Sequence, residues 1–392
     1  MRELTPDDAR HAVLGGGVFA CGGGGWASHG ELMGRTATTL SRPVLASVDD
    51  LPPDSWVATV TAIGAPAASN WEIRPVDYVH ALQALMAAVD VPITAVMTAQ
   101  NGYSTTVNGW TQSAMLGVRV LDAAGDVRAH PTGKLGALGL TTRPGYVATQ
   151  VVSGGNRDLH GHFSAVTRGS VATCDDVLRD ISVRTGGFIA AARNPVELAW
   201  VREHAALGAI TAALDLGEAM AAAAGEPGTV VLDAVLGSIG GRVLASGPVG
   251  QEVPLVTRGG FDHGTFRIGE ATVPYLNEYM AVDANGQRLA TYPDTIAILD
   301  AGTGLALSVK DLTAQAGSAE EEREVVLIAA DARHLPLSSS AVDPLALAEV
   351  EQIMGIELLA HLAADVLDRS GAGGDSEAGV VVRSRRDAVG LR

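Results

Sequence analysis

A run of four glycines near the N-terminus is the first feature of the sequence that could take part in chemistry. It follows an apolar stretch and precedes residues 28–40, which have the pattern of a helix. Consecutive glycines can adopt positive φ and turn several backbone N–H groups into one concavity, which suits an anion or a carbonyl oxygen when a helix follows. We therefore expect Gly23, Gly24 and Gly25 to bind a small-molecule substrate. The structural alternative is a tight crossover in which backbone packs against backbone.

The same loop fits a loose nucleotide-binding pattern. Gly22-x-Gly24-x-x-Ala27 matches the dinucleotide fingerprint, and Asp49 stands about where a ribose-binding acid would be expected. No long strand precedes the loop, and no Gly-x-x-x-x-Gly-Lys-Ser/Thr motif occurs anywhere, which excludes a Walker-type phosphate loop. Nucleotide binding is therefore kept as a second alternative.

Carboxylates and an amide stand at the ends of predicted strands. Asp122 closes a predicted strand, and in open α/β sheets the carboxyl ends of strands line the ligand crevice. Asn277 and Glu278 are adjacent in a β-rich stretch, and Asp294 follows a proline in a predicted turn. We expect these groups to supply charge and orientation at a crevice. A helix cap, a cross-strand surface pair and a turn cap are the respective structural alternatives.

His160-Gly161-His162 has the alternate spacing that puts two imidazoles on one side of an extended segment, as metal ligands often need. A surface loop rich in His and Gly gives the same pattern without a metal. A divalent metal is therefore an open cofactor assignment, and no metal ligands are assigned from the sequence.

Two domains are predicted to position these residues. Strand and helix patterns alternate over residues 1–165, which predicts a mixed α/β domain with helices covering a sheet. Residues 166–342 turn β-rich, with Asn285-Gly286 as a hairpin signal. One amphipathic helix is predicted over 343–369, capped by Asp343, and a disordered tail over 370–392. The predicted fold class is α/β with a β-rich C-terminal domain.

Composition excludes several classes of partner. The formal net charge of −17 leaves no basic footprint for nucleic acid. Two distant cysteines, Cys21 and Cys174, make neither a disulfide framework nor a metal knuckle. The N-terminus lacks a signal-peptide pattern, and no apolar run reaches the roughly 18 residues of a membrane helix. We expect a cytoplasmic protein with a small-molecule substrate and no membrane partner, and leave homo-oligomer formation open.

Several segments resemble a known family in their order and spacing. They are MRELTPDDARHAVLGGGVFACGGGG at the N-terminus, LGVRVLDAAGDVRAHP at 116–131, GGFDHG at 259–264, LNEYMAVDANGQRLATYPDTIAILDAGTG at 276–304 and VVLIAADA at 325–332. Over most of residues 1–340 the chain resembles the S-methyl thiohydantoin desulfurase family. The resemblance implies hydrolysis in which the thiohydantoin ring loses its S-methyl group as methanethiol and leaves a hydantoin. It also implies a divalent metal that activates water.

The chain departs from the family pattern at three acids. Gln100 stands where the pattern opens a Glu-x-Gly-Gly stretch, and Asp122-Ala123-Ala124-Gly125 keeps only one acid of Asp-x-Asp-Gly. Residues 127–132 lack a third acid that the family pattern has, and they contain a histidine, His130, that the pattern does not have. These losses would remove general-base or ligand capacity. The C-terminal set, Asn277, Glu278, Pro293 and Asp294, is retained.

The sequence therefore predicts a metal-assisted hydrolase of a small cyclic amide-type substrate, S-methyl thiohydantoin or hydantoin-like, with its active site between the two domains. The alternative is a catalytically altered family member that acts as a binding or regulatory protein. Both hypotheses require the glycine loop to face the C-terminal set across one cavity. The predicted catalytic residues are Asp122, His130, Glu278 and Asp294, and the predicted substrate-binding residues are Gly23, Gly24, Gly25, Arg128 and Asn277.

Overall fold

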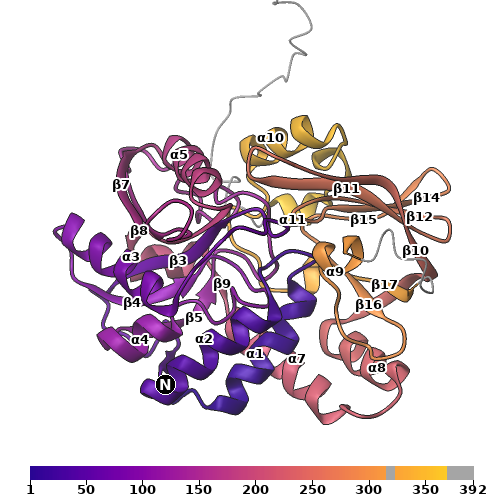
Figure 1. Cartoon of the computed structure of the whole chain (residues 1–392), viewed down its shortest axis with the longest axis horizontal. Coiled ribbons are helices and arrows are strands. Elements are labelled where there is room, and N and C mark those ends of the chain that lie inside the picture. The colour runs from indigo at the N-terminus through magenta and orange to yellow at the C-terminus, as the bar shows by residue number, and fades with distance from the viewer. Residues whose placement is uncertain (315–322, 369–392) are drawn as a thin grey trace, which may run out of the picture.

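The computed structural model describes residues 1–314 and 323–368, and the chain folds around two sheets. Figure 1 shows the first sheet with its helices on one side of the molecule and the strand-rich second part on the other. Mixed α/β architecture with a β-rich C-terminal part is thus confirmed. The predicted tail over 370–392 lies outside the described residues.

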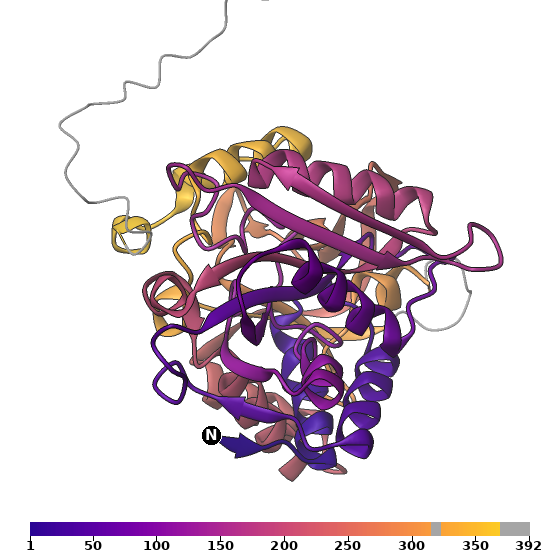
Figure 2. The same cartoon turned by 90° about the vertical axis from the view of Figure 1, so that its left-hand side faces the viewer.

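The first sheet has nine strands and carries most of the N-terminal half (Figure 2). Strands β2, β5, β4 and β3 pair in parallel, and the others pair antiparallel. In the order of the sheet, the strands are β1 (Arg2–Glu3), β2 (Val44–Ala46), β5 (Arg119–Ala124), β4 (Ile93–Thr98), β3 (Trp56–Gly64), β8 (Phe188–Glu197), β6 (Ala148–Gly154) and β7 (Phe163–Gly169), with β9 (Ala206–Leu207) beside β5.

This sheet does not end at residue 165, where we had placed the domain boundary. After β7 the chain forms a helix and returns as β8, which pairs antiparallel with β3 on one side and with β6 on the other. Residues 188–197 therefore lie in the middle of the first sheet. The predicted boundary at 165 assigns this strand to the second domain instead. An apolar strand looks the same in either sheet, so its partner could not be inferred from its composition.

Helices pack around the first sheet and fill the space toward the second. They are α1 (Pro6–Phe19), α2 (Ala27–Leu40), α3 (Pro75–Ala88), α4 (Trp110–Leu116), α5 (Val171–Arg184), α6 (Leu198–His204), α7 (Ala209–Ala222) and α8 (Gly228–Ile239). Helix α1 begins at a capping box, in which Thr5 and Asp8 bond each other's backbone N–H. Within α1, Gly15 packs directly on the Ala213 carbonyl of α7, where an added Cβ would lie 1.9 Å away.

The second sheet is antiparallel and has eight strands. In sheet order they are β15 (Gln287–Thr291), β14 (Ala281–Ala284), β12 (Ala271–Leu276), β11 (Phe261–Ile268), β10 (Gly241–Arg258), β17 (Glu324–Ala330) and β16 (Thr295–Asp300), with β13 (Glu278–Tyr279) beside β12. Asn285 and Gly286 join β14 to β15 with φ of 52° and 74°, so the predicted hairpin is confirmed.

The predicted single helix over 343–369 is wrong. Asp343 does cap α10 (Pro344–Met354), but the helix ends there because Gly355 adopts a left-handed φ of 68°. The 3-10 turn η2 (Leu359–His361) and α11 (Ala364–Asp368) follow, and residue 369 lies outside the described range. Two further short elements of the C-terminal part are α9 (Val309–Thr313) and η1 (Ala332–His334).

The two halves share one hydrophobic core and several backbone hydrogen bonds. Side chains of α1, α7 and α8 pack with those of β16 and β17. The Tyr279 N–H donates to the Cys21 carbonyl at 2.6 Å, and the Val309 N–H donates to the Gly22 carbonyl at 2.8 Å. Among the helices of residues 1–314 and 323–368, none combines the length and the hydrophobicity of a membrane-spanning segment.

Candidate active site

The glycine loop lies between α1 and α2 and contacts Glu278 with its backbone. Gly22, Gly24 and Gly25 have φ of 89°, 66° and 85°, a region that other residues adopt only with strain. At Gly23 the demand is close approach rather than φ, because an added Cβ would lie 2.1 Å from Glu278 Oε1. The loop therefore needs glycine both to turn and to let its backbone meet a carboxyl group.

Glu278 is buried at the start of β13 against this loop. The Gly24 N–H lies near its carboxyl group and acts to lower its pKa. Its Oε2 atom has no hydrogen-bond partner among the described residues. Burial raises the pKa of Glu278 to about 8, against the opposing charges of Arg128 and Arg179. Near neutral pH this carboxyl group is therefore mostly protonated and can donate a proton.

His130 is buried on the segment that follows β5. Its backbone N–H donates to Gln100 Oε1 at 3.0 Å, and its ring Nε2 lies 3.3 Å from the Ala99 carbonyl. Its Nδ1 atom has no partner in the described part of the chain. Burial, together with the nearby charge of Arg193, lowers the pKa of His130 to about 4. The imidazole is therefore neutral, and one ring nitrogen is available to accept a proton.

A buried ion pair that we did not predict stands at the same place. Arg193 of β8 donates to Asp175 of α5 at 3.0 Å, and Thr132 donates to the second oxygen of Asp175 at 3.2 Å. Arg179, one turn after Asp175, donates to the Pro131 and Gly260 carbonyls at 3.0 Å each. Two features of the sequence could have indicated these residues. One is Arg193, a charged residue inside the apolar strand FIAAARNPVE. The other is the i, i+4 spacing of Asp175 and Arg179 on α5.

These groups surround a cavity of about 40 Å³, which we call the inter-sheet cavity. A water molecule needs at least about 10–15 Å³ of such space, so the cavity has room for only a few waters. A ring-sized substrate would have to displace the side chains around it. The lining residues that bear on the chemistry are Gly24, Gly25, His130, Asp175, Arg179, Arg193, Asn277 and Glu278.

Asn277 lines this cavity but is also held by the second sheet. It adopts a φ of 59° and exchanges hydrogen bonds with Asp262, donating from its backbone at 2.7 Å and accepting with its side-chain oxygen at 2.8 Å. Its own conformation fixes where the next residue, Glu278, points.

Asp122, predicted to be catalytic, is placed elsewhere. Its carboxylate accepts from the backbone N–H groups of Ile210 and Thr211, both at 3.0 Å, and from the Thr211 hydroxyl at 2.6 Å. It therefore caps the N-terminus of α7 and does not line the inter-sheet cavity. The helix-cap alternative describes its contacts.

Neither Asp294 nor Arg128 lines the inter-sheet cavity. Asp294 accepts from the N–H groups of Ala332 at 3.0 Å and Thr291 at 3.2 Å. Arg128 is fully buried and donates to the carbonyls of Asp294 at 2.6 Å and Tyr279 at 3.0 Å. Arg128 therefore joins the two halves of the molecule, whereas the Asp294 carboxylate binds backbone within the C-terminal half. Of the predicted set, the glycine loop faces Asn277 and Glu278, whereas Asp294 lies outside the cavity lining.

A second cavity, of about 510 Å³, lies on the other side of the loop. Gly25 borders both cavities, and Trp26, Tyr103 and Lys310 line the larger one. Its size is within the range of small-molecule sites. It contains none of the catalytic residues predicted from the sequence.

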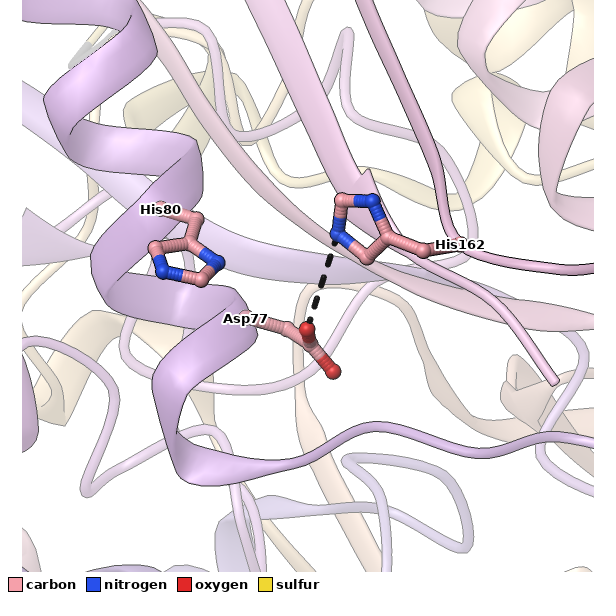
Figure 3. Close-up of side chains that lie close together, drawn as sticks. All are labelled: Asp77, His80 and His162. Carbon is pink, nitrogen blue, oxygen red and sulfur yellow. Dashed lines mark ion pairs between the residues drawn. The ribbon is translucent and has the colours of Figure 1, made fainter. Parts of the chain in front are cut away.

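One group of three potential metal ligands occurs in the described residues, and it lies outside both cavities. It consists of Asp77, His80 and His162 (Figure 3). The donors around the inter-sheet cavity do not form such a group, so the predicted catalytic metal finds no three-ligand site there. His160, the partner of His162 in the sequence pattern, is not part of the group.

Two family models match the chain in succession. The N-terminal domain of S-Me-THD-like proteins matches residues 7–157, and the C-terminal domain of the same proteins matches residues 170–334. The chain belongs to the S-Me-THD-like family. The resemblance to S-methyl thiohydantoin desulfurases found in the sequence is thereby confirmed.

The fold of this S-Me-THD-like chain also occurs in a crystal structure of a protein from Chromobacterium violaceum. The two are 22% identical with a TM-score of 0.65, over 91% of this chain and 97% of that one. At this identity the likeness concerns the fold. A search of curated proteins found no match.

Proposed function

We propose that this chain hydrolyses a small cyclic amide-type substrate, an S-methyl thiohydantoin or hydantoin-like ring, at the inter-sheet cavity. Membership of the S-Me-THD-like family supports the substrate class. The observation that carries the proposal is the meeting of the glycine loop with the protonated Glu278 in a cavity that also contains the neutral His130. A carboxylic acid and a neutral imidazole at one site can give and take protons near neutral pH.

The proposed reaction adds water to the ring carbon that carries the S-methyl group. The C–O bond forms, the C–S bond breaks, and methanethiol leaves. His130 takes one proton from water and passes it to the ring nitrogen. Glu278 gives its proton to the departing sulfur and takes the second proton of water from the new oxygen. Backbone N–H groups of the glycine loop and the Arg193 guanidinium stabilise negative charge on that oxygen.

No step of this proposal runs through a metal. The residues of the inter-sheet cavity offer a histidine, an ion-paired aspartate and a protonated glutamate, and a protonated carboxyl group is a poor metal ligand. The predicted divalent metal therefore stays a hypothesis for the reaction, which chelator treatment during turnover will test.

The alternative proposal is a family member that binds a ligand without hydrolysing it. It is motivated by Gln100, which stands where the family pattern has an acid. Its side chain holds the backbone of His130 instead of supplying a carboxylate to the cavity. Under this alternative, the ligand raises the unfolding temperature and is recovered unchanged.

The experiment is release of methanethiol from an S-methyl thiohydantoin by the purified chain, followed with a thiol-reactive dye. Glu278→Gln is expected to lower the rate at least about 100-fold, because Gln cannot donate the proton. Glu218→Gln, at an exposed glutamate on α7, is the matched control and is expected to leave the rate unchanged. Absence of turnover by the unmodified chain across a hydantoin and thiohydantoin panel, with or without added divalent metals, would contradict the hydrolase.

A further inference from the structure

Three side chains that could bind a metal converge at the surface beside α3. Asp77 and His80 come from α3, and His162 comes from the segment leading into β7 (Figure 3). One potential ligand atom from each residue lies within 4.8 Å of the others. The Asp77 side chain is buried and both histidines are exposed. We call these residues the α3 cluster.

The carboxylate of the α3 cluster is held in place from two sides. Asp77 Oδ2 accepts from the Arg74 N–H at 2.8 Å, and the Arg157 guanidinium donates to Oδ1 at 2.6 Å and to Oδ2 at 3.3 Å. Each carboxylate oxygen can accept more than one hydrogen bond or ligand bond, so Oδ1 retains a free lone pair.

Arg157 also contacts a second carboxylate, that of Glu72. Glu72 accepts from the Arg157 backbone N–H at 2.9 Å and lies 3.5 Å from its guanidinium group. Glu72 is itself paired with the Arg74 guanidinium at 2.6 Å, so two carboxylates face two cations here, and Asp77 is the carboxylate that also faces the histidines.

The two histidines face this carboxylate from different elements. His80 is three residues after Asp77, so the two side chains lie on one face of α3. His162 Nε2 is 3.9 Å from Asp77 Oδ1 and 3.1 Å from the Ser153 hydroxyl. To bind a metal through Nε2, the ring must give up the Ser153 bond, and its exposure leaves it room to turn.

Two imidazoles and one carboxylate are a donor set for borderline divalent metals such as Zn²⁺. Bonds of about 2.0–2.2 Å in a tetrahedral site bring the ligand atoms closer together than 4.8 Å, so binding requires a small inward rotation. Both histidine side chains are solvent-exposed, and their rotation disturbs no core packing.

We propose that Asp77, His80 and His162 bind a divalent transition metal, with Zn²⁺ as the probe, and that the metal links α3 to the segment between β6 and β7. Water would complete its coordination, since both histidines face solvent. The inference depends on the geometry of the α3 cluster and not on the proposed reaction at the inter-sheet cavity.

The test is calorimetric titration of the metal-free full-length chain with Zn²⁺. One equivalent is expected to bind. His80→Ala and His162→Ala are each expected to weaken binding at least about tenfold, and the double substitution abolishes it. His160→Ala is the matched control, since His160 is an exposed histidine two residues from His162 and outside the cluster, and it is expected to bind Zn²⁺ as the unmodified chain does.

Equal Zn²⁺ affinity in the unmodified chain and both single variants would overturn the proposal, as would absence of binding at about 100 μM Zn²⁺. His162→Gln provides a second substitution if His162→Ala does not fold, as judged by thermal unfolding. Methanethiol release is measured in parallel, so failure of the metal site and failure of the proposed hydrolase are told apart.

Discussion

The inter-sheet cavity and the α3 cluster both bring acids and histidines together, but they do so in opposite environments. In the cavity, burial raises the pKa of Glu278 to about 8 and lowers that of His130 to about 4, so both groups are neutral near pH 7. In the α3 cluster, His80 and His162 are exposed and only the carboxylate is buried. The same residue types therefore suit proton transfer in one region and capture of a cation in the other.

The largest expected effect tests how strongly the cavity depends on burial. Arg193→Met leaves the Asp175 carboxylate without its ion-pair partner, where both side chains are less than 5% exposed. We expect the free energy of unfolding to fall by about 3–5 kcal/mol in denaturant titration. Arg202→Met is the control, because its pair with Asp49 is exposed and should contribute only about 0–1 kcal/mol. Equal small losses in both variants would remove the contrast between buried and exposed charge.

The next effect concerns the close approach of the glycine loop to Glu278. The added methyl group of Gly23→Ala would collide with the Glu278 carboxyl group, and we expect a loss of about 1–3 kcal/mol together with loss of methanethiol release. Gly237→Ala in α8 is the control, since an added Cβ there meets no atom within 4 Å. A Gly23→Ala variant with full stability and turnover would show that this contact is unimportant.

A smaller effect is the dependence of stability on pH. Because the pKa of Glu278 is about 8 in the folded chain and near 4.5 when unfolded, the folded state holds more protons between these values. Its stability therefore falls as pH rises through this window, by at most about 1.4 kcal/mol per pH unit for this group.

The measurement compares unfolding free energies of the unmodified chain and Glu278→Gln from pH 6.5 to 8. We expect a shallower decline in the variant. Asp126, whose pKa burial raises to about 7, contributes the same sign in both chains and cancels in the difference. His130, whose pKa is about 4 in the folded chain, is present in both chains, and its contribution cancels in the difference as well. Parallel curves would show that Glu278 is already ionised.

The smallest effect tests the role of Asp122. Asp122→Ala removes three hydrogen bonds at the start of α7, and we expect a loss of about 0.5–2 kcal/mol in denaturant unfolding. Methanethiol release per folded molecule should not change, because Asp122 does not line the inter-sheet cavity. Loss of turnover without loss of stability would return Asp122 to the reaction.

The fold class and one half of the candidate site could be predicted from the sequence. Alternating strand and helix patterns indicate the first sheet, and the four glycines indicate a loop that a side chain of the second sheet approaches closely. The carboxylates were harder to place, because a strand-end aspartate such as Asp122 has the same pattern whether it caps a helix or lines a crevice. Only the position of α7 decides between the two.

The residues that the sequence did not reveal depend on pairings between distant segments. Asp175 and Arg193 reach the cavity because β8 inserts between β3 and β6, out of chain order. In the α3 cluster, the spacing of Asp77 and His80 on one helix face was a usable signal. Its completion by His162 required knowledge that the segment leading into β7 lies against α3.

The glycine loop is anchored to both halves of the molecule at once. The Cys21 and Gly22 carbonyls accept from Tyr279 and Val309 in the C-terminal half, and the Gly24 carbonyl accepts from Ser104 in the N-terminal half at 3.1 Å. A hinge motion that separated the two halves would break these bonds and pull the loop apart. Access for a ring-sized molecule must therefore come from side chains swinging aside while the backbone frame stays closed.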